Sequence, residues 1–432
     1  MSEVKKIATR VSYGNALVEL AKEHDDVYVL DADLAAATQT AIFKKEFPDR
    51  HIDCGIAECN MMGIAAGIAA TGKVPFASSF AMFAAGRAFE QVRNSIGYPH
   101  LNVKIGATHA GISVGEDGAT HQCNEDIALM RAIPGMVVIN PSDDIEAKAA
   151  VKAAYEYEGP VYMRFGRLAT PIINDNAEYK FEIGKGVTLR EGTDVAIIAT
   201  GLCVAESLAA AEKLAADGVN AKVINIHTIK PLDEELVVAA AKECGRVVTV
   251  EEHSVIGGLG AAVCETLSRK APTSVKTIGI QDCFGESGPA VALLKKYGLD
   301  SPTSAITVDF YQPKDGYTPT ATATPNAMVS DSSSSSSSSD ASYIIPENKR
   351  MYKSLNLLIG KKTKDSYYVC EKGSRNVYTM SSDTIEKITK LDAYTNMDHC
   401  VYSVLATSIK GYDVTSVSYT HLRAHETLSD IV

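Results

Sequence analysis

Short runs of β-branched residues alternate with stretches of helical periodicity between residues 27 and 166. The apolar runs cover residues 27–30, 74–77, 103–105, 136–139 and 161–163. Candidate helices cover residues 13–22, 58–70, 81–95 and 143–157. Such alternation predicts βαβ units and a mainly parallel sheet with helices on both faces. Ligands of such sheets bind beyond the carboxyl ends of the strands, so we expect a site in the loops that follow these runs.

A second block of the same kind follows a break at residues 171–185. Its apolar runs cover residues 194–201, 221–226, 246–250 and 275–280, and a helix is expected at residues 289–297. We therefore predict two successive three-layer α/β domains with mainly parallel sheets, at residues 1–180 and 185–309.

The character of the chain changes after residue 309. Residues 310–342 are rich in Thr, Pro and Ser and include eight consecutive serines, which predicts a flexible linker. Residues 343–432 contain short alternating stretches at 367–370 and 376–378, which favour a small β-rich tail. Residues 417–426 fit no pattern. The tail is either a genuine module or a fusion or assembly artefact, and it is excluded from the functional argument.

Composition and charge exclude several classes of protein. Hydrophobic residues make up 46% and charged residues 22% of the 432, as in globular proteins. With 42 Lys and Arg against 53 Asp and Glu, the net charge of −11 argues against nucleic acid or an anionic membrane as a partner. Residues 1–10 contain no signal-peptide core, and nine cysteines without a CxxC pair indicate reduced thiols. We expect a soluble, cytoplasmic protein.

Two features near the first strands are candidates for chemistry. Glu58 follows a predicted strand and a Gly turn and opens an apolar helix. It either complements the helix N-terminus or is a buried carboxyl that keeps a proton beside a cofactor nitrogen. Phe80 and Phe83 are three residues apart and would share one helix face, as a core stripe or as a pocket that stacks on a heterocycle.

The loop at residues 108–122 is the third candidate. It follows a strand and holds His109, Glu116, Asp117 and His121. Such loops carry binding sites. A metal site is the weaker alternative, because the loop has no compact HxH or HxxxH spacing. A fourth candidate lies at another strand end, where Arg164 and Arg167 could form a phosphate fork or a solvated pair.

Together these motifs resemble one family. Residues 7–309 resemble the C-terminal half of transketolase in the form made as a separate subunit. The matching stretches are Asp31-Ala-Asp-Leu34, Gly55-Ile-Ala-Glu58, Phe80-Ala-Met-Phe83, Gly115-Glu-Asp-Gly118, Thr120-His-Gln122, Gly257-Gly-Leu-Gly260 and Phe284-Gly-Glu-Ser-Gly288. The resemblance implies a pyrimidine-binding domain followed by the transketolase C-terminal domain.

The resemblance also implies roles for single residues. Glu58 matches the catalytic glutamate that contacts the aminopyrimidine ring of thiamine diphosphate, and Phe80 and Phe83 match the aromatic residues that stack on it. His109, Asp117 and His121 match residues that bind the sugar, with His121 also assisting proton transfer. Arg167, rather than Arg164, matches the phosphate-binding arginine.

Two positions depart from the family pattern. Gly86 replaces a third aromatic residue of the pocket, and Ala37 stands near a family serine that Thr38 could replace.

A missing motif implies a partner. Thiamine diphosphate enzymes hold Mg²⁺ and the diphosphate with a Gly-Asp-Gly segment, which this chain lacks. We expect no metal ligands here and an N-terminal-section subunit that completes the site, in an α2β2 enzyme of the pentose phosphate pathway that acts on sugar phosphates. The chain alone should be inactive. The alternatives are the β-subunit of a 2-oxo-acid dehydrogenase, a 1-deoxy-xylulose-5-phosphate synthase-like enzyme, or a non-catalytic scaffolding subunit.

Overall fold

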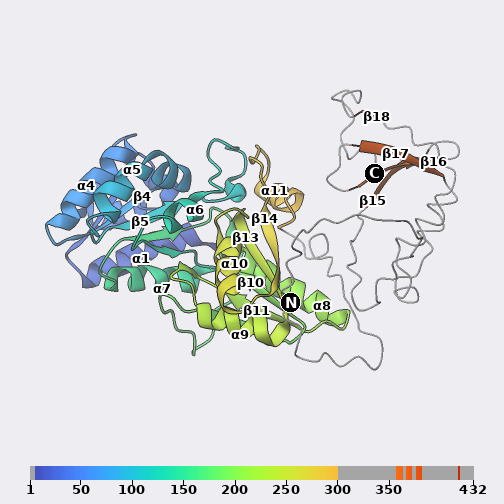
Figure 1. The fold of residues 1–432 in the computed structure, drawn as a ribbon. Helices are drawn as coiled ribbons and strands as arrows, with labels where there is room; N and C mark the ends of the chain where they lie inside the picture. Colours follow the sequence, from blue (N-terminus) through green and yellow to red (C-terminus); the bar gives the residue numbers. More distant parts are fainter. Residues whose placement is uncertain (1–4, 300–356, 363–365, 372–375, 382–416, 419–432) are drawn as a thin grey trace, which may run out of the picture. The chain divides into compact units, whose positions relative to one another are not determined.

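A computed structural model describes residues 5–299 and four short strands at 357–362, 366–371, 376–381 and 417–418. The chain divides into two units, residues 1–317 and 318–432 (Figure 1). In the second unit the four described strands pair antiparallel in the order β15 (Leu357–Lys362), β16 (Ser366–Glu371), β17 (Asn376–Ser381) and β18 (Val417–Ser418). The predicted linker at 310–342 lies outside the described residues.

The first domain is built on a seven-stranded sheet with the order β12-β6-β7-β5-β4-β2-β3. Its parallel strands are β2 (Val27–Asp31), β3 (His51–Asp53), β4 (Val74–Phe80), β5 (Lys104–Thr108), β6 (Val137–Ile139) and β7 (Val161–Arg164). Every residue of β4 and β5 is buried, as expected for central strands of a parallel sheet covered on both faces. The edge strand β12 (Thr228–Lys230) comes from the second half of the chain and is antiparallel to β6, which the sequence pattern does not predict.

Helices cover both faces of this sheet (Figure 1). One face packs against α1 (Thr9–Glu23), α3 (Ala41–Glu46) and α7 (Asp144–Glu156). The other packs against α4 (Glu58–Ala70), η2 (Met82–Arg87), η3 (Val92–Gly97) and α6 (Asp126–Arg131). Short elements complete the domain: α2 (Ala35–Thr38), α5 (Phe89–Gln91), the 3-10 turns η1 (Pro48–Arg50) and η4 (Ile112–Val114), and the paired strands β1 (Lys6–Ala8) and β8 (Ala169–Pro171).

The second domain has a five-stranded sheet with the order β14-β13-β10-β11-β9. Strands β10 (Val195–Ala199), β11 (Ala221–Asn225), β13 (Arg246–Ser254) and β14 (Ser274–Ile280) are parallel, and β9 (Val187–Arg190) is antiparallel to β11. Its helices are α8 (Cys203–Ala216), α9 (Glu234–Cys244), α10 (Leu259–Lys270) and α11 (Ala290–Lys296). The prediction of two successive α/β domains is confirmed.

The first domain covers the carboxyl edge of the second domain's sheet. Beyond β10, the Thr200 hydroxyl donates to the carbonyl of Asn140 over 3.3 Å. At the end of β11, the Asn225 amide donates to Glu146 over 2.7 Å. This edge is where an open α/β sheet ordinarily binds its ligand. Here it is an interface between the two domains.

The segment at residues 81–95 differs from the predicted α-helix. Strand β4 continues through Phe80, and the following helix contains two π-helical stretches, η2 and η3. The amide of Ala88 donates to the carbonyl of Phe83, five residues back, over 3.1 Å. Phe80 therefore ends a strand, and the prediction that Phe80 and Phe83 share one helix face is wrong. π-Helical turns are frequent at functional sites.

The seven cysteines among the described residues are all free thiols, in agreement with the reduced thiols expected from the sequence. In the same part of the chain, no helix is long and apolar enough to cross a membrane.

Candidate active site

Aromatic and imidazole rings gather at the carboxyl ends of β4 and β5. The Phe80 ring stacks on His109 with centroids 3.9 Å apart and lies parallel to Phe83 at 5.9 Å. The His121 ring meets the Phe83 ring edge-on at 5.3 Å. The structure thus brings together four of the predicted site residues, two from residues 80–83 and two from the loop at residues 108–122. The rings meet although Phe80 is not helical, because the strand end and the first π-turn place both phenylalanines over the same edge.

His109 is held in a constrained position within this cluster. Its backbone has a φ of 54°, which is uncommon for a residue other than glycine. Nδ1 lies 2.9 Å from the Thr108 hydroxyl, which orients the ring. Burial, followed by the charges of Arg10 and Arg167, lowers the pKa of His109 to about 3. The ring is therefore neutral near pH 7 and can exchange hydrogen bonds without carrying a charge.

Glu58 opens α4 immediately beyond β3, as predicted, and its side chain is only 3% exposed. Met61 and Met62 are fully buried on the next turn. The carboxylate itself is not in apolar surroundings, however, because Arg87 Nη1 lies 3.0 and 2.9 Å from its two oxygens. Glu58 is therefore the buried carboxyl that the sequence suggested, but in this structure it is paired with a guanidinium.

Arg87 also contacts the aromatic cluster. Its guanidinium lies over the Phe83 ring, 4.5 Å from the centroid, while half of the side chain is exposed. Sequence reasoning missed Arg87, since only the fold brings the end of η2 to the start of α4. Beside it, a Cβ on Gly86 would lie 2.4 Å from Met82 Cε. Met82 therefore packs over Gly86, at the position where the family resemblance implies a third aromatic residue.

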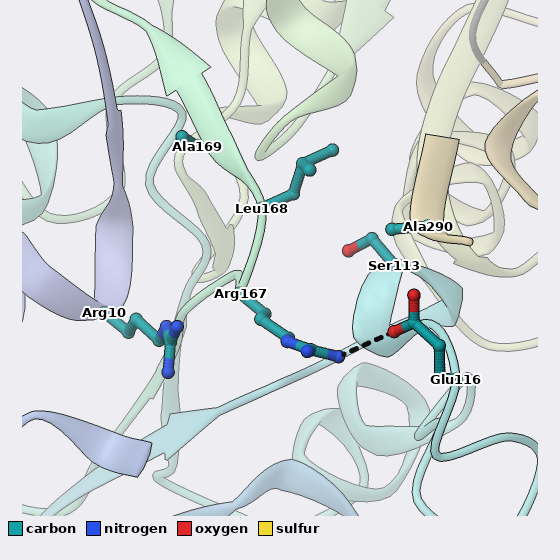
Figure 2. Close-up of a pocket in the computed structure, with 7 residues that line it drawn as sticks. All are labelled: Arg10, Ser113, Glu116, Arg167, Leu168, Ala169 and Ala290. Carbon is teal, nitrogen blue, oxygen red and sulfur yellow. Dashed lines mark hydrogen bonds and ion pairs between the residues drawn. The ribbon is translucent and has the colours of Figure 1, made fainter. Parts of the chain in front are cut away.

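Two arginines form a basic pocket next to the ring cluster (Figure 2). Arg10 Nη1 donates to the carbonyl of Ala37 over 2.7 Å and lies 3.4 Å from His109 Nε2. Burial, followed by the positive charge of Arg167, lowers the pKa of Arg10. The pocket has a volume of about 240 Å³ and is lined by Arg10, Ser113, Glu116, Arg167, Leu168, Ala169 and Ala290. An anion would be attracted to this pair.

Arg10 is the second residue that the sequence analysis missed. It lies in the first turn of α1, where a positive side chain opposes the helix dipole. That unfavourable placement is a local signal that could have identified it.

The two arginines at the end of β7 have different environments: Arg164 is the last residue of the strand and Arg167 follows it. Arg164 is buried, donates through Nε to Asp126 over 2.9 Å and through Nη2 to the carbonyl of Glu252 over 2.8 Å. It serves packing between the domains. Arg167 is partly exposed in the basic pocket and pairs with Glu116 at 3.3 Å. The predicted choice of Arg167 over Arg164 as the anion-binding arginine agrees with this placement, although the role itself is a prediction.

Two other predicted residues lie outside the cluster. Asp117 is exposed on the loop next to Glu116. Thr38 is fully buried. Its hydroxyl donates to the carbonyl of Leu34 over 3.0 Å and lies 2.9 Å from the hydroxyl of Thr40. Thr38 therefore does not line the basic pocket, and the expectation that it replaces the family serine is wrong. Within the described ranges no three His, Cys, Asp or Glu side chains are grouped closely enough to hold a metal ion.

Family models match both domains. Residues 5–172 match the model described as "Transketolase, pyrimidine binding domain", and residues 184–303 match "Transketolase, C-terminal domain". A "Putative transketolase C-terminal section" of Methanocaldococcus jannaschii is 55% identical over 298 residues, which cover 68% of this chain and 93% of the relative. A "6-deoxy-6-sulfo-D-fructose transketolase subunit SqwH" of a Clostridium species is 47% identical over 291 residues, 67% of this chain and 90% of the relative.

Longer relatives and a solved structure agree with these matches. Human transketolase is 38% identical over 299 residues, which cover 68% of this chain and 47% of the human protein. A solved "Split gene transketolase, inactive beta4 tetramer" superposes with a TM-score of 0.63 at 52% identity, over 68% of this chain and 95% of that one.

Proposed function

Because this chain belongs to the transketolase family, as a subunit of the split form, we propose that it contributes one half of a thiamine diphosphate-dependent transketolase. The enzyme would transfer a two-carbon ketol unit between phosphosugars. The observation that carries this proposal is a continuous series of contacts from Glu58 through Arg87, Phe83, Phe80 and His109 to Arg10. The series joins a buried carboxylate to a basic pocket. The carboxylate suits a cofactor ring, and the basic pocket suits the phosphate of a sugar.

The cofactor end suits an aminopyrimidine. Glu58 offers a buried carboxyl to a ring nitrogen, and the exposed side of Phe83 offers a stacking surface. In the structure Arg87 contacts both the Glu58 carboxylate and the Phe83 ring, so its guanidinium would move aside when a cofactor ring binds. Bound thiamine diphosphate supplies the nucleophilic carbon and the electron sink for cleavage of a carbon–carbon bond. The residues of this chain bind and orient the ring.

The substrate end suits a sugar with a terminal anion. Arg10 and Arg167 would hold the phosphate, and the neutral His109 ring would hydrogen-bond a sugar oxygen. His121, on the edge of the aromatic pair, would assist proton transfer, and Asp117 would accept a hydrogen bond from a hydroxyl. A sulfonate is also a tetrahedral oxyanion, and one relative is named for a sulfosugar. Sulfofructose is therefore the second candidate substrate.

The partner would supply the rest of the site. One relative is named as a C-terminal section and another as a subunit, and the solved tetramer of β chains is described as inactive. We infer that an N-terminal-section subunit binds Mg²⁺ and most of the diphosphate, in an α2β2 enzyme. We further infer that the enzyme acts in the cytoplasm, in the pentose phosphate pathway.

A coupled assay tests the proposal. Xylulose 5-phosphate and ribose 5-phosphate are supplied with thiamine diphosphate and Mg²⁺ to this chain, to the N-terminal-section subunit and to their mixture. We expect turnover in the mixture alone, and Glu58→Gln should abolish it while the complex still assembles. Turnover by this chain alone would contradict the split site. Turnover only with 6-deoxy-6-sulfofructose as donor would select the second substrate.

A further inference from the structure

The turn that borders the basic pocket is anchored in the second domain. Ile112 begins η4, and its fully buried side chain belongs to the apolar cluster of the second domain, which includes Ile197, Val250 and Leu293. The side chain of Gln122 holds the same loop from another side, since its Nε2 donates to the carbonyls of Ile112 and of Glu286 over 3.1 and 2.8 Å. A segment of the first domain is thus held by core packing and hydrogen bonds of its neighbour.

Glu252 of the second domain makes a polar contact with this turn. It lies in β13, is buried, and accepts a hydrogen bond from the Ser113 amide at Oε1 over 2.6 Å. Its own carbonyl accepts from Arg164 of the first domain over 2.8 Å. Gly111 passes so close that a Cβ there would lie 2.4 Å from the Glu252 carboxyl carbon. With a φ of 77°, Gly111 allows the backbone to reach the carboxylate.

The turn η4 also holds Arg167, the arginine proposed to bind the anion. The carbonyl of Val114, the next residue after Ser113, accepts a hydrogen bond from Arg167 Nη1. A Cβ on Gly115 would lie 3.6 Å from that nitrogen and 3.3 Å from the carbonyl of Gly288 in the second domain. Ser113 and Ala290 line the pocket beside the guanidinium (Figure 2). The orientation of Arg167 therefore depends on where the second domain places this turn.

We propose that Glu252 is a positioning residue for Arg167, through which the second domain sets the affinity of the basic pocket for a tetrahedral anion. The inference rests on the anion-binding part of the proposed function. Glu252 is not among the residues that line the pocket. It acts by fixing the Ser113 amide, and with it the Val114 carbonyl that receives the guanidinium.

The chain contains a matched control for this residue. Glu251 is the preceding residue of β13, is also buried, and accepts hydrogen bonds from the amides of Leu259 and Gly260 over 2.7 and 2.8 Å. It caps α10 and does not contact the turn. Variants of Glu251 therefore lose the same chemical group from the same strand without disturbing the pocket.

The experiment compares the Ala, Asp and Gln variants of both residues. Inorganic phosphate is titrated calorimetrically into the full chain, and steady-state kinetics with the partner subunit compare ribose 5-phosphate with the unphosphorylated acceptor glycolaldehyde. Loss of one hydrogen bond at the anchor should raise the Kd for phosphate and the KM for ribose 5-phosphate about tenfold in E252A. kcat with glycolaldehyde should stay unchanged. E252Q should restore most of the affinity, because its amide oxygen still accepts the Ser113 N–H.

The Glu251 variants should unfold at lower temperature while their affinity for phosphate stays at the wild-type value. Equal loss of phosphate affinity in both series would overturn the proposal, as would equal loss of kcat with both acceptors. E252D, which keeps the charge but shortens the side chain, decides the question if E252A does not fold, since it should weaken phosphate binding more than E251D. A wild-type mixture that binds phosphate but has no turnover would instead count against the proposed function.

Discussion

Replacing Arg87 by Ala removes the group that covers the proposed cofactor surface at Glu58 and Phe83. In the structure one nitrogen of Arg87 contacts both oxygens of Glu58, and the guanidinium covers Phe83. If an aminopyrimidine takes these two contacts, the arginine stabilises only the cofactor-free state. The variant should then lower the stability of the free chain and strengthen cofactor binding by the same free energy.

The size of the effect follows from the two contacts. A hydrogen bond between charged groups contributes about 1.5–3 kcal/mol, and exposure of half the Arg87 side chain to solvent reduces this to about 1 kcal/mol. The contact with the Phe83 ring adds about 0.5 kcal/mol at an exposed site. The free energy of unfolding of the chain should therefore fall by about 1.5 kcal/mol. The Kd for thiamine diphosphate should decrease about tenfold.

Two measurements test this prediction. Urea unfolding, followed by circular dichroism because the chain has no Trp, measures stability. Calorimetric titration of thiamine diphosphate with Mg²⁺ into the assembled complex measures affinity. Arg93→Ala is the matched control, since Arg93 is an exposed arginine of the next π-turn whose Nη1 donates to Asn94. Weaker cofactor binding by Arg87→Ala would refute the reasoning, because it would show that the guanidinium stays as a ligand.

Three further predictions concern the pocket and the buried histidines. Arg10→Met should raise KM for ribose 5-phosphate about tenfold and leave glycolaldehyde turnover unchanged; equal losses with both acceptors would contradict an anion-binding role. Gly111→Ala, at a positive φ and against Glu252, should lower the free energy of unfolding by about 1–3 kcal/mol in urea, and an unchanged value would show that the turn can relax. Burial is the first cause that lowers the pKa values of His109, to about 3, and of His253, to about 4. On these two rings the unfolded chain therefore binds more protons than the folded one below pH 6.5, so their contribution to the unfolding free energy should fall as the pH drops from 6.5 toward 4. Glu146 and Glu251 contribute with the opposite sign, because burial raises their pKa values to about 6 and about 7. The test is therefore made on the rings themselves, and imidazole NMR signals of His109 and His253 that titrate near pH 6.5 would contradict neutral buried rings.

The alternation of apolar runs with helical periodicity is enough to predict both α/β domains and most strand positions. Buried parallel strands leave this pattern in the sequence because every one of their residues faces a helix layer. The same order predicts that residues beyond β3, β4 and β5 meet at one edge, which is where Glu58, Phe80 and His109 lie. The details of the helix after β4 were not predictable, since a π-turn adds one residue per turn without a distinct composition.

Local sequence therefore determined the domains, the edge of the sheet that carries the site and several residues on it. Only the tertiary structure decided the partners of those residues. Arg87 reaches Glu58 across 29 positions of sequence, and Glu252 reaches Ser113 across 139. Contacts of this kind depend on how two layers or two domains pack, and a charged side chain gives no periodic signal of the neighbour it will meet. Periodicity reports which face of an element is buried, whereas the identity of the group opposite is set by packing between elements that the chain brings together only when it folds.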